Sequence, residues 1–128
     1  MENRTEQDAV TERIISCAID VHSELGPGLL ERPYAIALAI ALKDAGLNFE
    51  AEKPFPIVFR GKIIGDYRPD LIVEDRAVVE IKSVERYDPV FLAQMLTYLR
   101  VTGKTVGLII NFNRPRLVDG IKRVVLRA

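Results

Sequence analysis

Three charged residues in the segment DYRPDLIVEDRAVVEIKS, residues 66–83, have types and a spacing that could do chemistry. Asp70 precedes one short apolar stretch, and Glu80 and Lys82 alternate with apolar residues in the next. Two facing carboxylates can hold a Mg²⁺ ion, which keeps several of its waters and can take up a substrate phosphate. Such an ion acidifies a bound water, and a neighbouring ammonium group can orient that water or stabilise negative charge. The segment therefore suggests metal-assisted phosphate chemistry, with a polar strand face at an open sheet edge as the alternative.

The length of the turn between the two apolar stretches decides whether the carboxylates meet. Side chains alternate along a strand, so Glu80 and Lys82 share one face. If residues 74–76 form a three-residue loop, Asp70 lies directly opposite Glu80, whereas a two-residue loop would place it in the wrong row. Like charges opposed across two strands destabilise a sheet. The pairing would thus cost stability unless a divalent cation lay between the carboxylates.

The composition is that of an ordinary soluble domain. The chain has 128 residues, of which 48% are hydrophobic and 28% are charged, and this length is enough to bury a core. We expect one domain over residues 1–128, with residues 1–7 as a flexible tail. No apolar run approaches the ~20 residues of a membrane span. The polar N-terminus is unlike a signal peptide, so we expect no membrane contact.

The content of metal-binding side chains narrows the choice of ion. The chain has one cysteine, Cys17, and one histidine, His22. A zinc site built from Cys and His is therefore excluded, and any metal must be a hard ion with oxygen ligands, Mg²⁺ or Mn²⁺. A single cysteine also favours a reducing compartment, so we expect a cytoplasmic protein. His22 falls near the end of the first predicted helix, where we expect a surface or C-terminal helix histidine rather than a catalytic base.

The charge is balanced overall but uneven along the chain. The net charge is zero, which argues against a protein that simply coats a polyanion. From residue 100 to the end there are seven basic residues and one acidic residue. The candidate phosphate contacts are Arg68, Arg114, Arg116, Lys122 and Arg123. An equally good interpretation is a solvated surface that faces the more acidic N-terminal part.

The hydrophobic pattern predicts a mixed α/β domain. Apolar periodicity and Gly or Pro breaks predict helices over residues 8–25, 30–45 and 89–101, and strands over 50–59, 63–73, 77–83, 106–112 and 121–126. The run over 106–112 is apolar almost throughout, as is typical of a buried strand reached by a helical crossover. The order α-α-β-β-β-α-β-β predicts a mixed sheet with helices on its faces.

Three short motifs resemble those of known nucleases. The letters PD at residues 69–70, followed by EIK at 80–82, match the signature of the PD-(D/E)XK nuclease superfamily. Gln94 and Tyr98, four residues apart on one helical face, resemble the QxxxY motif of its RecB-type members. The segment GLLERPY, residues 28–34, fits the motif of the small GxxExxY family, which is assigned to the same superfamily. The resemblance extends over nearly the whole chain.

The resemblance implies a fold and an activity. The implied fold is a restriction-endonuclease-like αβββαβ core, in which helices flank a mixed central sheet, with an extra N-terminal helix and a C-terminal strand. The implied activity is Mg²⁺- or Mn²⁺-dependent cleavage of nucleic acid, DNA before RNA, by a protein that could form a homodimer. The basic residues named above would then contact the nucleic acid.

The resemblance also implies roles for individual residues. The implied metal ligands are Glu31, Asp70 and Glu80. The implied catalytic residues are Asp70, Glu80, Lys82, Gln94 and Tyr98, with Lys82 as the catalytic lysine. Glu31 could instead be a favourable charge at a helix N-terminus. Tyr34, on the same helical face, could simply pack the helix on the sheet.

Two other classes of function stay open from the sequence. A catalytically silent domain of the same fold would bind nucleic acid or a protein partner, and the neutral net charge favours this class. A small-molecule hydrolase would use the same metal site. Because no residue of the signature is missing, the nuclease is the leading hypothesis.

Overall fold

The computed structural model describes residues 4–127, and over residues 4–8 only the backbone. The elements are α1 (Arg4–Leu25), α2 (Glu31–Asp44), β1 (Phe49–Ala51), β2 (Phe55–Phe59), β3 (Lys62–Tyr67), β4 (Leu71–Val73), β5 (Ala77–Lys82), α3 (Val90–Thr102), β6 (Val106–Asn111), the 3₁₀-helix η1 (Leu117–Gly120) and β7 (Ile121–Val125). Residues 4–7 of the expected tail belong to α1, and residues 1–3 lie outside the described residues. Within residues 4–127, no helix has both the length and the apolar character needed to cross a membrane.

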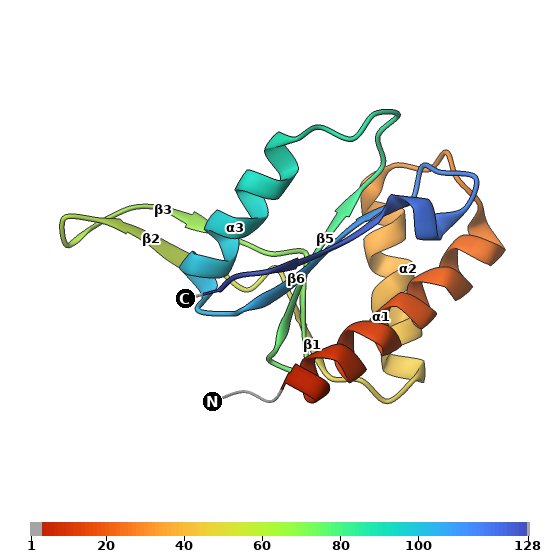
Figure 1. The fold of residues 1–128 in the computed structure, drawn as a ribbon, viewed down its shortest axis with the longest axis horizontal. Coiled ribbons are helices and arrows are strands. Elements are labelled where there is room, and N and C mark those ends of the chain that lie inside the picture. Colours follow the sequence, from red (N-terminus) through yellow and green to blue (C-terminus); the bar gives the residue numbers. More distant parts are fainter. Residues whose placement is uncertain (1–3, 128) are drawn as a thin grey trace.

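A five-stranded mixed sheet forms the centre of the fold (Figure 1). Its strand order is β1-β4-β5-β6-β7, in which β5 and β6 are parallel and all other neighbours antiparallel. The helices α1 and α2 lie on one side of this sheet and α3 on the other. Along the chain, α2-β1-β4-β5-α3-β6 reproduces the expected αβββαβ order, with α1 before it and β7 after it.

Each face of the sheet has its own core, and strand alternation assigns the residues of β5 to the two cores. Ala77, Val79 and Ile81 are buried under α1 and α2. Val78 is buried on the other face with Ile72, against Met95 and Leu99 of α3. Because side chains alternate along a strand, the residues at 80 and 82 lie on this second face. Glu80 and Lys82 therefore lie on the face of the sheet that α3 covers.

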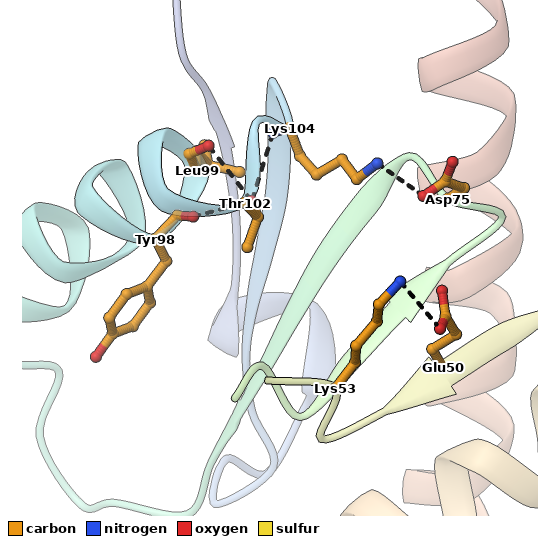
Figure 2. A network of polar contacts seen from close by, with 7 residues as sticks. All are labelled: Glu50, Lys53, Asp75, Tyr98, Leu99, Thr102 and Lys104. Carbon is orange, nitrogen blue, oxygen red and sulfur yellow. Dashed lines mark hydrogen bonds and ion pairs between the residues drawn. The ribbon is translucent and has the colours of Figure 1, made fainter. Parts of the chain in front are cut away.

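The loop between β4 and β5 has the length that the carboxylate pairing requires. Val73 pairs with Ala77, so residues 74–76 form a three-residue loop, as expected. Lys104 reaches across from the end of α3 and pairs with Asp75 at 2.7 Å (Figure 2). The backbone N–H of Glu74 donates to Asn48, at 2.8 Å. These contacts hold the register of β4 and β5.

Two of the expected strands are each divided in the structure. The predicted strand 50–59 becomes β1 and β2, and the predicted strand 63–73 becomes β3 and β4. β2 and β3 pair with each other as a separate two-stranded hairpin. The division falls at Glu52, whose φ is 53°, and at the prolines Pro54 and Pro69, which lack the N–H that a continuous ladder needs. The N–H of Glu52 donates to the carbonyl of Pro69 at 3.0 Å and closes the base of the hairpin.

A glycine at the end of η1 gives a test of this packing. A Cβ on Gly120 would lie 2.2 Å from the carbonyl oxygen of Asn111 at the end of β6. Since a backbone oxygen cannot swing aside, we expect Gly120→Ala to lower the free energy of unfolding by about 1–3 kcal/mol in urea titrations. Gly65→Ala is the control, because a Cβ there meets no atom within 4 Å. Equal effects of the two substitutions would contradict the described contact.

Candidate active site

The structure brings Asp70 and Glu80 together. Leu71 pairs with Val79, so the next position in register sets Asp70, just before β4, beside Glu80 of β5. The backbone N–H of Asp70 donates to Oε1 of Glu80 at 3.4 Å. Oδ2 of Asp70 accepts the backbone N–H of Ile81 at 2.8 Å. The predicted juxtaposition of the two carboxylates is therefore present, and backbone hydrogen bonds from both strands fix it.

A tyrosine that the motif analysis did not single out holds Glu80 in place. Tyr67, the last residue of β3, is buried, and its hydroxyl donates to Oε1 of Glu80. Its ring stacks on Tyr98 of α3, with centroids 3.8 Å apart and ring planes 9° apart. Tyr98, which Figure 2 shows projecting from α3, therefore contacts the site through Tyr67. In the sequence, this role is indicated by an aromatic residue that stands three positions before Asp70 in the same segment.

Lys82 and Gln94 occupy the expected elements on the α3 side. Lys82, two residues after Glu80, is half-buried, and its Nζ lies 4.6 Å from the centroid of the Phe91 ring. This cation–π contact keeps the ammonium group beside the carboxylates rather than in bulk solvent. Gln94 is half-buried on α3, one turn before Tyr98.

Burial disfavours the charged forms of both carboxylates, and the charge of Asp70 further disfavours that of Glu80. Burial, followed by the charge of Asp70, raises the pKa of Glu80 to about 7, although the hydrogen bond from Tyr67 and the charge of Lys82 oppose this shift. Burial also raises the pKa of Asp70, against the hydrogen bond from Ile81. Two desolvated carboxylates in contact need a proton or a cation to stay side by side. The site is thus electrostatically prepared for a positive ligand.

Glu31 lines a cavity that adjoins Asp70. A cavity of about 390 Å³ between α2 and the sheet is lined by Glu31, Glu52 and Asp70, among others. The charges of Glu31 and Glu52 contribute to the raised pKa of Asp70, after burial. Within residues 4–127, however, no three Asp, Glu, His or Cys side chains gather closely enough to hold a metal ion. The structure therefore joins Asp70 to Glu80 and brings Glu31 only to the same cavity as Asp70.

The donor set of the pair suits a hard cation. Asp70 and Glu80 supply carboxylate oxygens alone, which are the ligands that Mg²⁺ and Mn²⁺ prefer. The only histidine, His22, lies elsewhere: it is in the last turn of α1, as expected, but it is buried rather than at the surface, and its Nε2 is 2.8 Å from the carbonyl oxygen of Arg114. The residues present thus fit a divalent cation bound through the two carboxylates.

The basic candidates do not form one patch. Arg68 pairs with Asp66 at 3.1 Å beside the site. Arg114 donates through Nη1 to the carbonyls of Val84 and Glu85, at 3.2 and 2.9 Å, and so holds the loop that follows β5. The exposed basic residues on the η1 and β7 side of the fold are Arg116, Lys122 and Arg123.

The tyrosine of the GLLERPY segment is a structural residue. Tyr34 is fully buried, and its hydroxyl donates to the carbonyl of Gly26 at 2.5 Å and accepts from the N–H of Leu29 at 3.2 Å. Its ring stacks on Phe112, with centroids 4.4 Å apart. Tyr34 therefore fastens the turn before α2 to the end of β6, and Glu31 begins the helix that this turn positions.

Comparisons with known proteins agree with this architecture. A family model described as PD-(D/E)XK nuclease superfamily matches residues 8–124. The structure is similar to the crystal structure of an alkaline exonuclease (LHK-Exo) from Laribacter hongkongensis, with a TM-score of 0.52 and 16% sequence identity. The alignment covers 99% of this chain and 72% of that one. At this identity the likeness shows the fold alone, a restriction-endonuclease-like α/β fold. No curated protein matches the sequence.

Proposed function

Because the chain belongs to the PD-(D/E)XK nuclease superfamily, we propose that it is a metal-dependent nuclease that hydrolyses phosphodiester bonds in nucleic acid. The observation that carries the proposal is the juxtaposition of Asp70 and Glu80, which the hydrogen bond from the Asp70 N–H joins. Both are half-buried carboxylates whose raised pKa values favour a cation between them. The motif over residues 28–34 further supports membership of the GxxExxY family, and Gln94 with Tyr98 supports the QxxxY assignment.

Asp70 and Glu80 would hold the metal ion, with Glu31 facing it across the cavity. A bound Mg²⁺ or Mn²⁺ ion would lower the pKa of a water molecule and offset the negative charge on the phosphate. Asp70 and Glu80 are already fixed by hydrogen bonds from Ile81 and Tyr67, so little reorganisation accompanies binding. Glu31 and Glu52 add negative charge to the cavity wall, which favours a cation there.

Lys82 would act on the phosphate and the attacking water. Its ammonium group shares a face with Glu80 and is held over the ring of Phe91. A fixed positive charge in this position stabilises the negative charge that develops on the phosphate oxygens, and its N–H groups can orient the nucleophilic water. Tyr98 would act as a positioning residue, because it reaches Glu80 only through the stacked ring of Tyr67.

DNA is the substrate that we favour. The similar structure is that of an alkaline exonuclease, and the exposed residues Arg116, Lys122 and Arg123 can meet phosphates, which supports a nucleic-acid substrate. The choice of DNA over RNA stays a prediction from the family resemblance. A cytoplasmic location and a homodimer stay predictions.

The activity is tested by incubating purified protein with single- and double-stranded DNA and RNA. Cleavage should require Mg²⁺ or Mn²⁺ and stop when EDTA is added. Binding of nucleic acid without cleavage of any of the four substrates would refute the nuclease and support the catalytically silent alternative.

Tyr67→Phe tests the support given to Glu80. The phenylalanine keeps the ring stacked on Tyr98 and removes the hydroxyl that bonds Glu80. The loss of one hydrogen bond to a charged group, worth about 1.5–3 kcal/mol, predicts that kcat/KM falls by roughly 10- to 100-fold. Tyr98→Phe, which also keeps the stack, should fall by less than about threefold. An equal loss in both variants would contradict the role of the Tyr67 hydroxyl.

A further inference from the structure

The tip of the β2–β3 hairpin exposes an unusual amount of apolar surface. Its four large apolar side chains, Val58, Phe59, Ile63 and Ile64, are between 56% and 73% exposed. The hairpin extends away from the rest of the molecule (Figure 1), and its strands pair only with each other. By strand register, Val58 and Ile63 share one face of the hairpin, and Phe59 lies on the other face with Lys62. Exposed apolar side chains that share a face mark a surface that another molecule covers.

The base of the hairpin, in contrast, is firmly attached to the candidate active site. Phe55 packs with the core cluster under α3. Tyr67, opposite Phe55 in register, bonds Glu80 and stacks on Tyr98. A two-stranded hairpin alone is marginally stable in water, so these contacts are what hold it. The hairpin is therefore an arm that starts at the catalytic carboxylates and ends in an apolar tip.

The charge of the arm selects a polyanion as the molecule that covers the tip. Residues 58–64 at the tip contain two basic residues, Arg60 and Lys62, and no acidic one. The guanidinium of Arg60 lies 4.8 Å from the centroid of the Phe59 ring, so positive charge and apolar surface occupy the same tip. Contact between two copies of this tip would oppose like charges without an acidic partner in either segment. A nucleic acid offers both phosphates for the charges and bases for the apolar side chains.

The length of the arm places the tip within reach of a bound duplex. From Tyr67 to Lys62, β3 advances five residues, about 17 Å at the usual strand rise. Base pairs of B-DNA are spaced 3.4 Å apart, so an arm that runs along the duplex axis would place its tip roughly five base pairs from the site.

We propose that the tip of the β2–β3 hairpin is a wedge that inserts apolar side chains, Val58 and Ile63 foremost, between the bases of a DNA duplex. Arg60 and Lys62 contact the phosphates that flank the opened step. Insertion of this kind unstacks the bases and kinks the duplex. The proposal rests on the proposed function for the position of the duplex, and it adds a separate property, the opening of base pairs away from the scissile bond.

A duplex with 2-aminopurine in place of adenine measures the wedge directly, because this base brightens when it is unstacked. Each probe is a 20-base-pair duplex with 2-aminopurine at one position, and the position is moved stepwise along the duplex. The protein is the Lys82→Ala variant in buffer with Mg²⁺, and it serves as the parent because this substitution suppresses cleavage. We expect the parent to raise the fluorescence several-fold at one or two positions. Val58→Ser with Ile63→Ser should remove at least four-fifths of that rise and weaken binding, measured by anisotropy, about tenfold. Ile40→Ser is the matched control, an equally exposed isoleucine on α2 that should behave as the parent.

The basic residues of the tip give a second, independent measurement. Arg60→Ala with Lys62→Ala leaves the apolar side chains in place and should reduce the slope of log affinity against log salt by about two. Lys43→Ala, an exposed lysine on α2, should leave the slope unchanged. Because all of these positions are exposed, the melting temperatures of the variants should stay near that of the parent.

Two results would overturn the wedge. The first is a serine double variant that binds and brightens the probe as the parent does. The second is a wild-type protein that sediments as a dimer, while the serine double variant sediments as a monomer and binds the duplex as tightly as before. The tip would then be a contact between two copies of the chain. The nuclease proposal can fail separately. If wild type does not cleave DNA but the Lys82→Ala parent still raises the fluorescence of the probe, the nuclease is refuted and the wedge is supported.

Discussion

Replacing Lys82 with alanine should lower metal-dependent cleavage by about 10²–10³-fold without weakening metal binding. The ammonium group, held over Phe91, supplies fixed positive charge beside the two carboxylates. Removing one such preorganised charge costs about 2.7–4 kcal/mol of transition-state stabilisation. The carboxylates that would hold the ion stay in place, and losing a nearby positive charge does not disfavour a cation. Single-turnover cleavage of a labelled oligonucleotide and calorimetric titration with Mn²⁺ measure the two quantities.

Lys104→Ala is the matched control for this substitution. Lys104 pairs with Asp75, which lies in the loop before β5 and so at the opposite end of this strand from Lys82. Its loss should leave cleavage within about threefold of wild type. Asp70→Ala, in contrast, should remove both cleavage and Mn²⁺ binding. Cleavage that survives both Lys82→Ala and Asp70→Ala would show that the activity resides elsewhere.

Glu80→Gln should abolish cleavage and yet stabilise the metal-free protein above neutral pH. The folded-state pKa of Glu80 is raised from 4.5 to about 7, mainly by burial and then by the charge of Asp70. The folded protein therefore binds this proton more tightly than the unfolded chain, and its stability is highest below about pH 4.5. As the pH rises from about 4.5 to about 7, wild type should lose up to about 3 kcal/mol, at about 1.4 kcal/mol per pKa unit.

Glutamine removes this loss because it keeps a carbonyl oxygen for the hydrogen bonds from Tyr67 and Asp70 but carries no charge. Urea unfolding in EDTA should thus show Glu80→Gln more stable than wild type by about 1–3 kcal/mol at pH 8, and close to wild type at pH 4.5. Mg²⁺ should raise the stability of wild type and not of the variant. Glu85→Gln, an exposed position, is the control and should change little. A variant that is less stable than wild type at pH 8 would mean that the Glu80 charge does not destabilise the apoprotein.

The register of the carboxylates could be predicted from the sequence because it depends on local rules. A three-residue loop and strand alternation are enough to set Asp70 beside Glu80, and the loop at residues 74–76 confirms it. The order of helices and strands also follows from periodicity and from glycine and proline breaks.

The hairpin and the support of the site could not be predicted in the same way. The apolar pattern of residues 50–73 predicts strands but not their partners, so the separation of β2 and β3 from the main sheet was missed. Tyr67 becomes a partner of Glu80 only because β3 ends beside β5, and Arg114 binds carbonyls of a loop 30 residues away in sequence. Glu31 was expected among the metal ligands, and its separation from Glu80 depends on the packing of α2 against the sheet.

A crystal of the wild-type protein soaked in Mn²⁺ and measured at an anomalous wavelength tests the central claim most directly. The structure predicts one strong anomalous peak between the carboxylates of Asp70 and Glu80, with oxygen atoms as its only protein ligands, and no peak in crystals of Asp70→Ala. A crystal at millimolar Mn²⁺ that shows no peak at this pair, or an ion held by Glu31 and Glu52 without Glu80, would contradict it.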